Sequence, residues 1–171
     1  MGHWGFSYIG CIWLLMLILP NLAWTRCKPQ GYSAEGESRV LLAMERSGEV
    51  CVSLFSVCFS DYDLRPFSPW FFWLTGSFLL MLMYEAWWIR YFCSGRTLAD
   101  FYGSFWGIPV AGASLLVLAF LLLAIYGRVL WLGLSSILLG IGHIGIHLRH
   151  RRSLSSRPAL FTPGGKGPSL R

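Results

Sequence analysis

Five apolar stretches, each about 20 residues long, do most to decide what this chain can fold into. They cover residues 4–24, 38–60, 69–89, 105–125 and 129–148. As an α-helix rising roughly 1.5 Å per residue, a stretch of this length covers the hydrocarbon core of a bilayer, which is about 30 Å thick. Only 13% of the residues are charged, which is about half the share typical of a water-soluble domain. The sequence therefore predicts an all-α fold, a polytopic bundle of five transmembrane helices in residues 1–149.

The first two stretches each leave an alternative open. Residues 4–24 resemble the apolar part of a signal peptide, but the leader has no Lys or Arg and residues 21–24 form a poor cleavage site, so we expect a retained helix. In residues 38–60, one face of the predicted helix is polar and the other is apolar. The polar face carries Arg39, Glu45, Arg46, Glu49, Ser53, Ser56 and Ser60. This helix should turn that face into the bundle, or lie flat at the membrane interface and leave four spans.

The distribution of basic residues predicts an orientation. With five spans, Arg65 and Arg128 flank one side of the membrane. The other side receives Arg26, Lys28, Arg39, Arg90, Arg96, Arg149, Arg151, Arg152, Arg157, Lys166 and Arg171. Lys and Arg are enriched on the cytosolic side, so the N-terminus is expected outside and the C-terminus in the cytosol.

Residues 150–171 form a basic tail that is rich in Ser, Pro and Gly. Nothing in this composition can build a core, so we expect a disordered cytosolic tail. Next to an apolar helix, its positive charge is suited to anionic lipid rather than to nucleic acid. The lipid bilayer is therefore the expected partner, and the sequence indicates no protein partner.

The same orientation gathers ionisable side chains from three predicted helices in the cytosolic half of the bundle. The candidate polar cluster comprises Glu45, Arg46, Glu49, Glu85, Arg90, His143 and His147. An ionisable group inside a membrane costs free energy, and such residues therefore mark candidate functional sites. The two arginines are available as counter-charges for the carboxylates.

The chemistry of this cluster has several interpretations. His143 and His147 are four residues apart, so they share a helix face and can hold one metal ion if carboxylates complete the shell. They can also handle a proton or a ligand, and the favoured interpretation is that they are hydrogen-bonding residues near a basic helix end. Glu45 and Glu49 can belong to an ion-pair network that locks helices, or to a site for a cation, a proton or a polar head group.

Three hypotheses for function follow. The first is a membrane protein that handles an ion, a proton or a small polar ligand at the cluster. The second is a structural or accessory membrane subunit. The third is a metal-dependent membrane enzyme acting on lipid head groups. The sequence has no phosphate-binding loop, no nucleophile elbow and no dinucleotide fingerprint, and it indicates no particular cofactor.

Three segments carry a resemblance to a known group. They are YEAWWIRYF at residues 84–92, residues 100–113, and LGIGHIGIHL at residues 139–148. Together they resemble small multi-pass membrane proteins of unknown function from Gram-positive bacteria. The resemblance covers most of the chain up to about Arg149. It implies an integral protein of a bacterial cell membrane, and it implies no activity.

Overall fold

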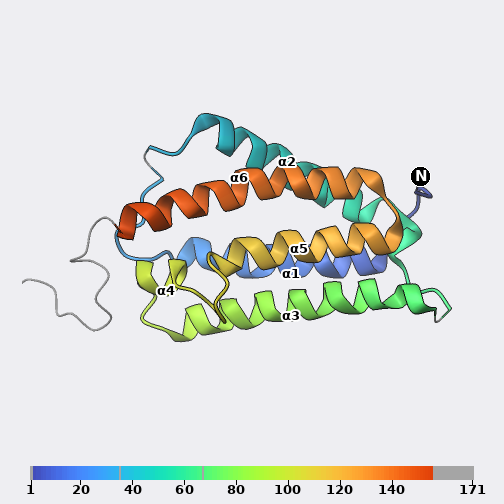
Figure 1. Ribbon diagram of the computed structural model, residues 1–171, viewed down its shortest axis with the longest axis horizontal. Helices are drawn as coiled ribbons and strands as arrows, with labels where there is room; N and C mark the ends of the chain where they lie inside the picture. Colours follow the sequence, from blue (N-terminus) through green and yellow to red (C-terminus); the bar gives the residue numbers. More distant parts are fainter. Residues whose placement is uncertain (1, 35, 67, 156–171) are drawn as a thin grey trace, which may run out of the picture.

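The computed structural model describes residues 2–34, 36–66 and 68–155, and these ranges consist of helices joined by loops and turns (Figure 1). The α-helices are α1 (Tyr8–Arg26), α2 (Arg39–Val57), α3 (Phe72–Cys93), α4 (Leu98–Tyr102), α5 (Ala111–Gly127) and α6 (Leu130–Ser155). Two short 3-10 turns, η1 (Ser60–Tyr62) and η2 (Pro69–Phe71), precede α3. The described residues form no strand, and the predicted all-α class is confirmed.

The five long helices run up and down in chain order (Figure 1). α1, α3 and α6 finish at the end of the bundle where α2 and α5 begin and where α4 lies, which we call the α4 end. The chain starts at the opposite end, where η1, η2 and the short α5–α6 turn also lie. α6 packs against α2 and α5, and α3 packs against α5.

The helix boundaries differ most from the predicted ones at two places. The fourth helix begins at Ala111 rather than near residue 105, because Phe105 and Ile108 exchange backbone hydrogen bonds in a turn and Val110 has a φ of +46°. The last helix continues to Ser155, beyond the predicted end at residue 148. The start of the predicted disordered tail is therefore helical, and residues 156–171 lie outside the described part of the chain.

The backbones of α2 and α6 touch at two glycines. A Cβ atom on Gly48 would lie 2.5 Å from the backbone of Leu139, and one on Gly142 would lie 2.4 Å from the backbone nitrogen of Glu45. Both distances are shorter than any real Cβ contact, so each position requires glycine for the helices to approach this closely. Small residues allow the same close approach between helices in membranes.

A series of buried hydrogen bonds connects α1, α3 and α5. The indole nitrogen of Trp13 in α1 donates to the hydroxyl of Ser77 in α3 at 2.9 Å. The Ser77 hydroxyl donates in turn to the carbonyl oxygen of Ala119 in α5 at 2.7 Å. Because all three groups lie in an otherwise apolar core, their mutual pairing avoids the cost of leaving a buried polar group without a partner.

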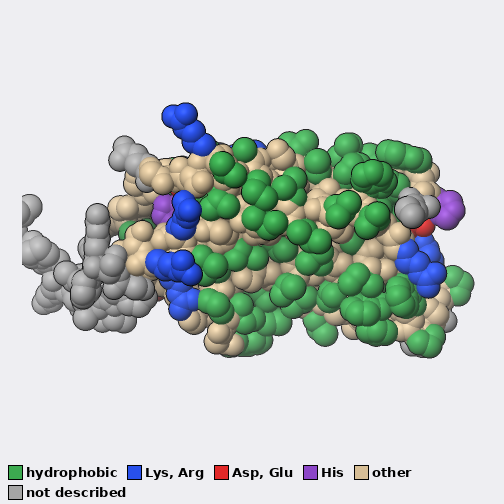
Figure 2. All heavy atoms as spheres, turned by 45° about the horizontal axis from the view of Figure 1, so that its top comes forward, with side chains coloured by type: hydrophobic (Ala, Val, Ile, Leu, Met, Phe, Trp, Pro, Cys, Tyr) green, Lys and Arg blue, Asp and Glu red, His purple; other side chains and the backbone are tan. Residues whose placement is uncertain are grey.

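The outer surface of the bundle is apolar along its middle. Figure 2 shows hydrophobic side chains over the central part of the molecule and Lys and Arg near its two ends. Large exposed apolar residues come from every long helix and include Leu19, Val50, Leu79, Leu118 and Ile137. Within the described part of the chain, two helices are long and apolar enough to cross a membrane, Tyr8–Arg26 and Leu130–Leu154. The apolar helix α5 is shorter, at 17 residues.

Candidate functional site

An open cavity of about 620 Å³ lies toward the α4 end and is lined by residues from all six α-helices and from the α1–α2 loop. Its aromatic lining consists of Trp24, Tyr32, Tyr84, Trp87, Trp88, Phe101 and Tyr102. Its ionisable side chains, apart from the tyrosines, are Lys28, Glu37, Glu45, Arg46, Glu49, His143 and His147. Ligand sites in proteins have this size range and this combination of apolar walls with a few polar groups.

A carboxylate–imidazole pair forms the centre of the polar lining. Nδ1 of His143 in α6 lies 2.5 Å from Oε1 of Glu45 in α2. The two side chains are only 19% and 13% exposed. Gly142 allows this contact, because the residue just before His143 lies directly against the Glu45 backbone. A buried carboxylate held in this way can accept a proton, a metal ion or a cationic ligand group.

Two further histidines extend this pair along one face of α6. The ring of His147 lies 4.5 Å from that of His143, between centroids, and also contacts Tyr102. Nε2 of His150 lies 2.9 Å from Oε1 of Glu37 in the α1–α2 loop. We call the five residues Glu45, His143, His147, His150 and Glu37 the histidine row, which has a carboxylate at each end. Among the described residues, no group forms a hydrogen bond with His147.

Two tyrosines cover the outer part of the row. Burial, followed by the charges of Glu37 and Glu45, raises the pKa of the Tyr32 hydroxyl above its usual value. Burial also raises the pKa of Tyr102, with smaller contributions from Tyr32 and Glu37. Both phenols therefore stay protonated at neutral pH, so they can donate hydrogen bonds to a bound molecule.

The structure brings five of the seven predicted cluster residues to the cavity. Glu45, Glu49, His143 and His147 line it, together with Arg46. Arg46 is 71% exposed and binds Glu49 across 3.0 Å, so this pair lies at the rim. The polar face of α2 therefore turns only partly into the bundle.

Glu85 and Arg90 do not line the cavity. Arg90 donates to the carbonyl oxygen of Asp100 at 2.8 Å, and its guanidinium lies over the ring of Phe105. Tyr84 and Trp88 line the cavity, and Glu85 is rotated about 100° from Tyr84 around the helix. One carboxylate oxygen of Glu85 is buried and has no hydrogen-bond partner in the described part of the chain.

Sequence reasoning missed Glu37, His150 and the aromatic lining. His150 follows His147 by three residues, a spacing that places both on one helix face, so the row was visible in the sequence. Glu37 lies in a loop, and no periodicity indicates where a loop side chain points.

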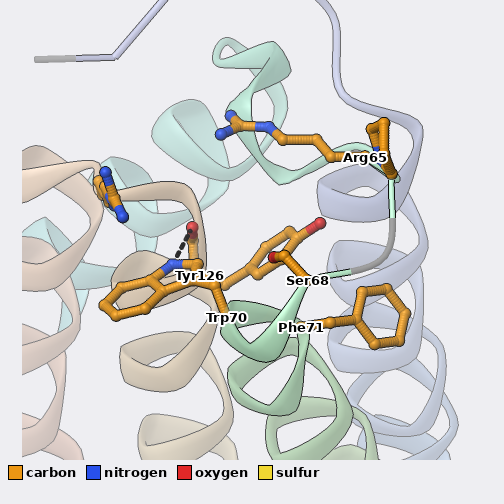
Figure 3. A pocket seen from close by; sticks show the side chains of 7 residues that line it. Arg65, Ser68, Trp70, Phe71 and Tyr126 are labelled. Carbon is orange, nitrogen blue, oxygen red and sulfur yellow. Dashed lines mark hydrogen bonds between the residues drawn. The ribbon is translucent and has the colours of Figure 1, made fainter.

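A second, smaller cavity of about 160 Å³ lies at the opposite end of the bundle. Figure 3 shows Trp70 donating through its indole nitrogen to the carbonyl oxygen of Tyr126, at 3.0 Å. The guanidinium of Arg128 lies 4.7 Å from the centre of the Trp70 ring. These contacts hold the α5–α6 turn against η2, and the lining of this cavity contains no carboxylate or histidine.

The described residues contain no group of three or more His, Cys, Asp or Glu side chains that could hold a metal ion. The hypothesis of a metal on His143 and His147 therefore finds no completed ligand shell in that part of the chain. Comparison of the chain with protein-family models, with curated proteins and with solved structures found no match.

Proposed function

We propose that this protein is a multi-pass membrane protein that binds a small polar ligand or ion in the cavity at the α4 end. The observation that carries the proposal is the half-buried Glu45–His143 pair, which opens onto a cavity of about 620 Å³. An ion pair that served only to lock two helices would need no such space beside it. His147 adds a polar group without a protein hydrogen bond among the described residues.

The apolar surface supports the membrane part of this proposal. Large exposed hydrophobic side chains occur on every long helix, and basic side chains gather near the ends of the bundle (Figure 2). A water-soluble protein rarely exposes a continuous apolar surface of this extent. α2 and α3 carry charged and aromatic side chains, so neither is identified as a spanning helix by hydropathy alone. They nevertheless complete an up-and-down bundle of five long helices.

The proposed topology places the cavity near the cytosolic face of a bacterial cell membrane. Most of the described Lys and Arg residues lie in or next to the α4 end, including Arg26, Lys28, Arg39, Arg96 and Arg149. Arg65 and Arg128 lie at the opposite end. Under the positive-inside rule, the α4 end faces the cytosol and the N-terminus lies outside. A ligand would therefore enter the cavity from the cytosolic side.

Binding to the purified full-length chain in lipid nanodiscs tests the proposal. The panel contains Na⁺, K⁺, choline, acetate and glycerol, and the readout is the thermal unfolding midpoint. A ligand at about 100 times its Kd stabilises the folded state by about 2.7 kcal/mol, which is several degrees for a chain of this size. At least one probe should raise the midpoint of the wild type and not that of Glu45→Gln.

Glu85→Gln is the matched control, because it removes a partly buried carboxylate outside the cavity. It should respond to the probe as the wild type does. A panel that leaves the wild-type midpoint unchanged at high probe concentration would overturn the proposal. A probe that stabilises the wild type and Glu45→Gln equally would place binding elsewhere and would also count against it.

A further inference from the structure

We propose that the ligand of this cavity is a small organic cation, of the substituted-ammonium class. This inference rests on the proposed function and adds the chemistry of what is bound. Two independent features of the cavity carry it, namely the aromatic composition of its walls and the depth at which charges of each sign lie.

The walls of the cavity are unusually rich in aromatic rings. Three tryptophans, three tyrosines and one phenylalanine line it. The faces of such rings carry a partial negative charge that attracts an ammonium group, and cages of this kind bind substituted ammonium ligands. The chain itself provides an example, because the ammonium of Lys28 lies 5.3 Å from the centre of the Trp24 ring.

The charges of the cavity are sorted by depth. The side chains of Glu45 and Glu37 are only 13% and 12% exposed, and each is paired with a histidine. The positive side chains of Arg46 and Lys28 are both exposed to solvent. The carboxylates therefore lie deeper in the cavity than its Arg and Lys side chains. A cation is attracted to this interior, whereas an anion would meet two buried carboxylates and the negative ring faces.

The size of the cavity favours an organic cation over a bare metal ion. A metal ion is held by several ligands that converge at about 2 to 2.6 Å, and the described residues contain no such group. An ammonium carrying alkyl groups instead fills space and places its carbon atoms against aromatic rings. A cavity of about 620 Å³ with seven aromatic side chains is suited to that kind of contact.

A charge-swapped pair of probes tests the inference on the full-length protein in nanodiscs, by titration calorimetry. Choline is compared with 3,3-dimethylbutan-1-ol, which has the same shape with a carbon atom in place of the nitrogen, and with acetate. Choline should bind at least about ten-fold more tightly than the neutral analogue, and acetate should not bind. Trp88→Leu and Glu45→Gln should each weaken choline binding.

Lys28→Ala keeps the test decisive if either of those variants fails to fold, because Lys28 is exposed. Removing its ammonium frees the Trp24 ring and takes a positive charge from the cavity, so choline binding should tighten by a few-fold. A loss of binding in Lys28→Ala would indicate an anion site and overturn the inference. Binding of the neutral analogue or of acetate without choline would overturn the inference while the proposed function stands. Absence of binding by any probe, including the inorganic cations, would overturn both.

Discussion

Gly142→Ala should disconnect α2 from α6 at the point where the Glu45–His143 pair forms. The new Cβ atom would lie 2.4 Å from the backbone nitrogen of Glu45 and 2.7 Å from the carbonyl oxygen of Leu41. Ordinary contact begins at about 3.4 Å, so the helices would have to separate by about 1 Å. Backbone atoms cannot rotate away, and the 2.5 Å contact between His143 and Glu45 would stretch beyond hydrogen-bonding distance.

The size of the change in the free energy of unfolding follows from two destabilising contributions and one stabilising contribution. Overpacking costs about 1 to 3 kcal/mol, and losing a buried hydrogen bond to a charged group costs about 1.5 to 3 kcal/mol. Alanine recovers about 1 kcal/mol through its higher helix propensity. The free energy of unfolding of Gly142→Ala should therefore fall by about 1.5 to 5 kcal/mol, and choline binding should be lost with it.

Reversible unfolding in mixed micelles measures this change, and Gly133→Ala in the same helix is the matched control. A Cβ atom on Gly133 would meet only the Cβ of Ala124, at 3.8 Å, which is an ordinary contact. That variant should be as stable as the wild type, or up to about 1 kcal/mol more stable. If Gly142→Ala proved as stable as Gly133→Ala, α2 and α6 would not pack as closely as described, and the reasoning would be refuted.

Two further predictions concern the opposite end of the bundle and the topology. Burial alone would raise the pKa of Asp61, but hydrogen bonds from His3 and the charge of Arg65 outweigh it and lower the pKa below its usual value. The ionised Asp61 carboxylate therefore stabilises the folded state at neutral pH, and this stabilisation is lost as the pH falls below about 4. Between pH 5 and 3, the free energy of unfolding of Asp61→Asn should change less than that of the wild type. Reporter tags fused to the two termini should be found on opposite sides of the membrane, with the C-terminal tag in the cytosol; both tags on one side would show that α2 does not cross.

The lengths of the five apolar stretches predicted the long helices, because burying a helix in lipid or core requires a continuous apolar run. The start of α5 was missed because residues 105–110 are apolar and yet fold as a turn, with Trp106 and Val110 both at positive φ. Hydropathy cannot detect such a turn, although Gly107 and Pro109 signalled one. The end of α6 was missed for the opposite reason: the run Arg149–Arg152 is polar, yet the helix continues through it and Leu154 beyond it still packs against the core.

The site could be predicted only as far as helical spacing reaches. The spacing of His143 and His147 placed both on one face, and the up-and-down order brought that face near Glu45. Helical spacing does not show which face of a helix packs against which neighbouring helix. Glu85 was assigned to the cluster by its depth in the membrane, but the side chains of α3 that line the cavity are Tyr84, Trp87 and Trp88.

The placement of the charges explains why α2, the least apolar long helix, belongs in the bundle. Its position is set by glycine contacts with α6 on both helices, at Gly48 and Gly142. These contacts bring Glu45 to His143 and leave Arg46 at the rim beside Glu49. A helix kept only for packing would be more stable with apolar residues at these positions, since a buried ion pair seldom repays its desolvation. Under the proposed function, Glu45 is kept at this position despite its desolvation cost because it binds the ligand.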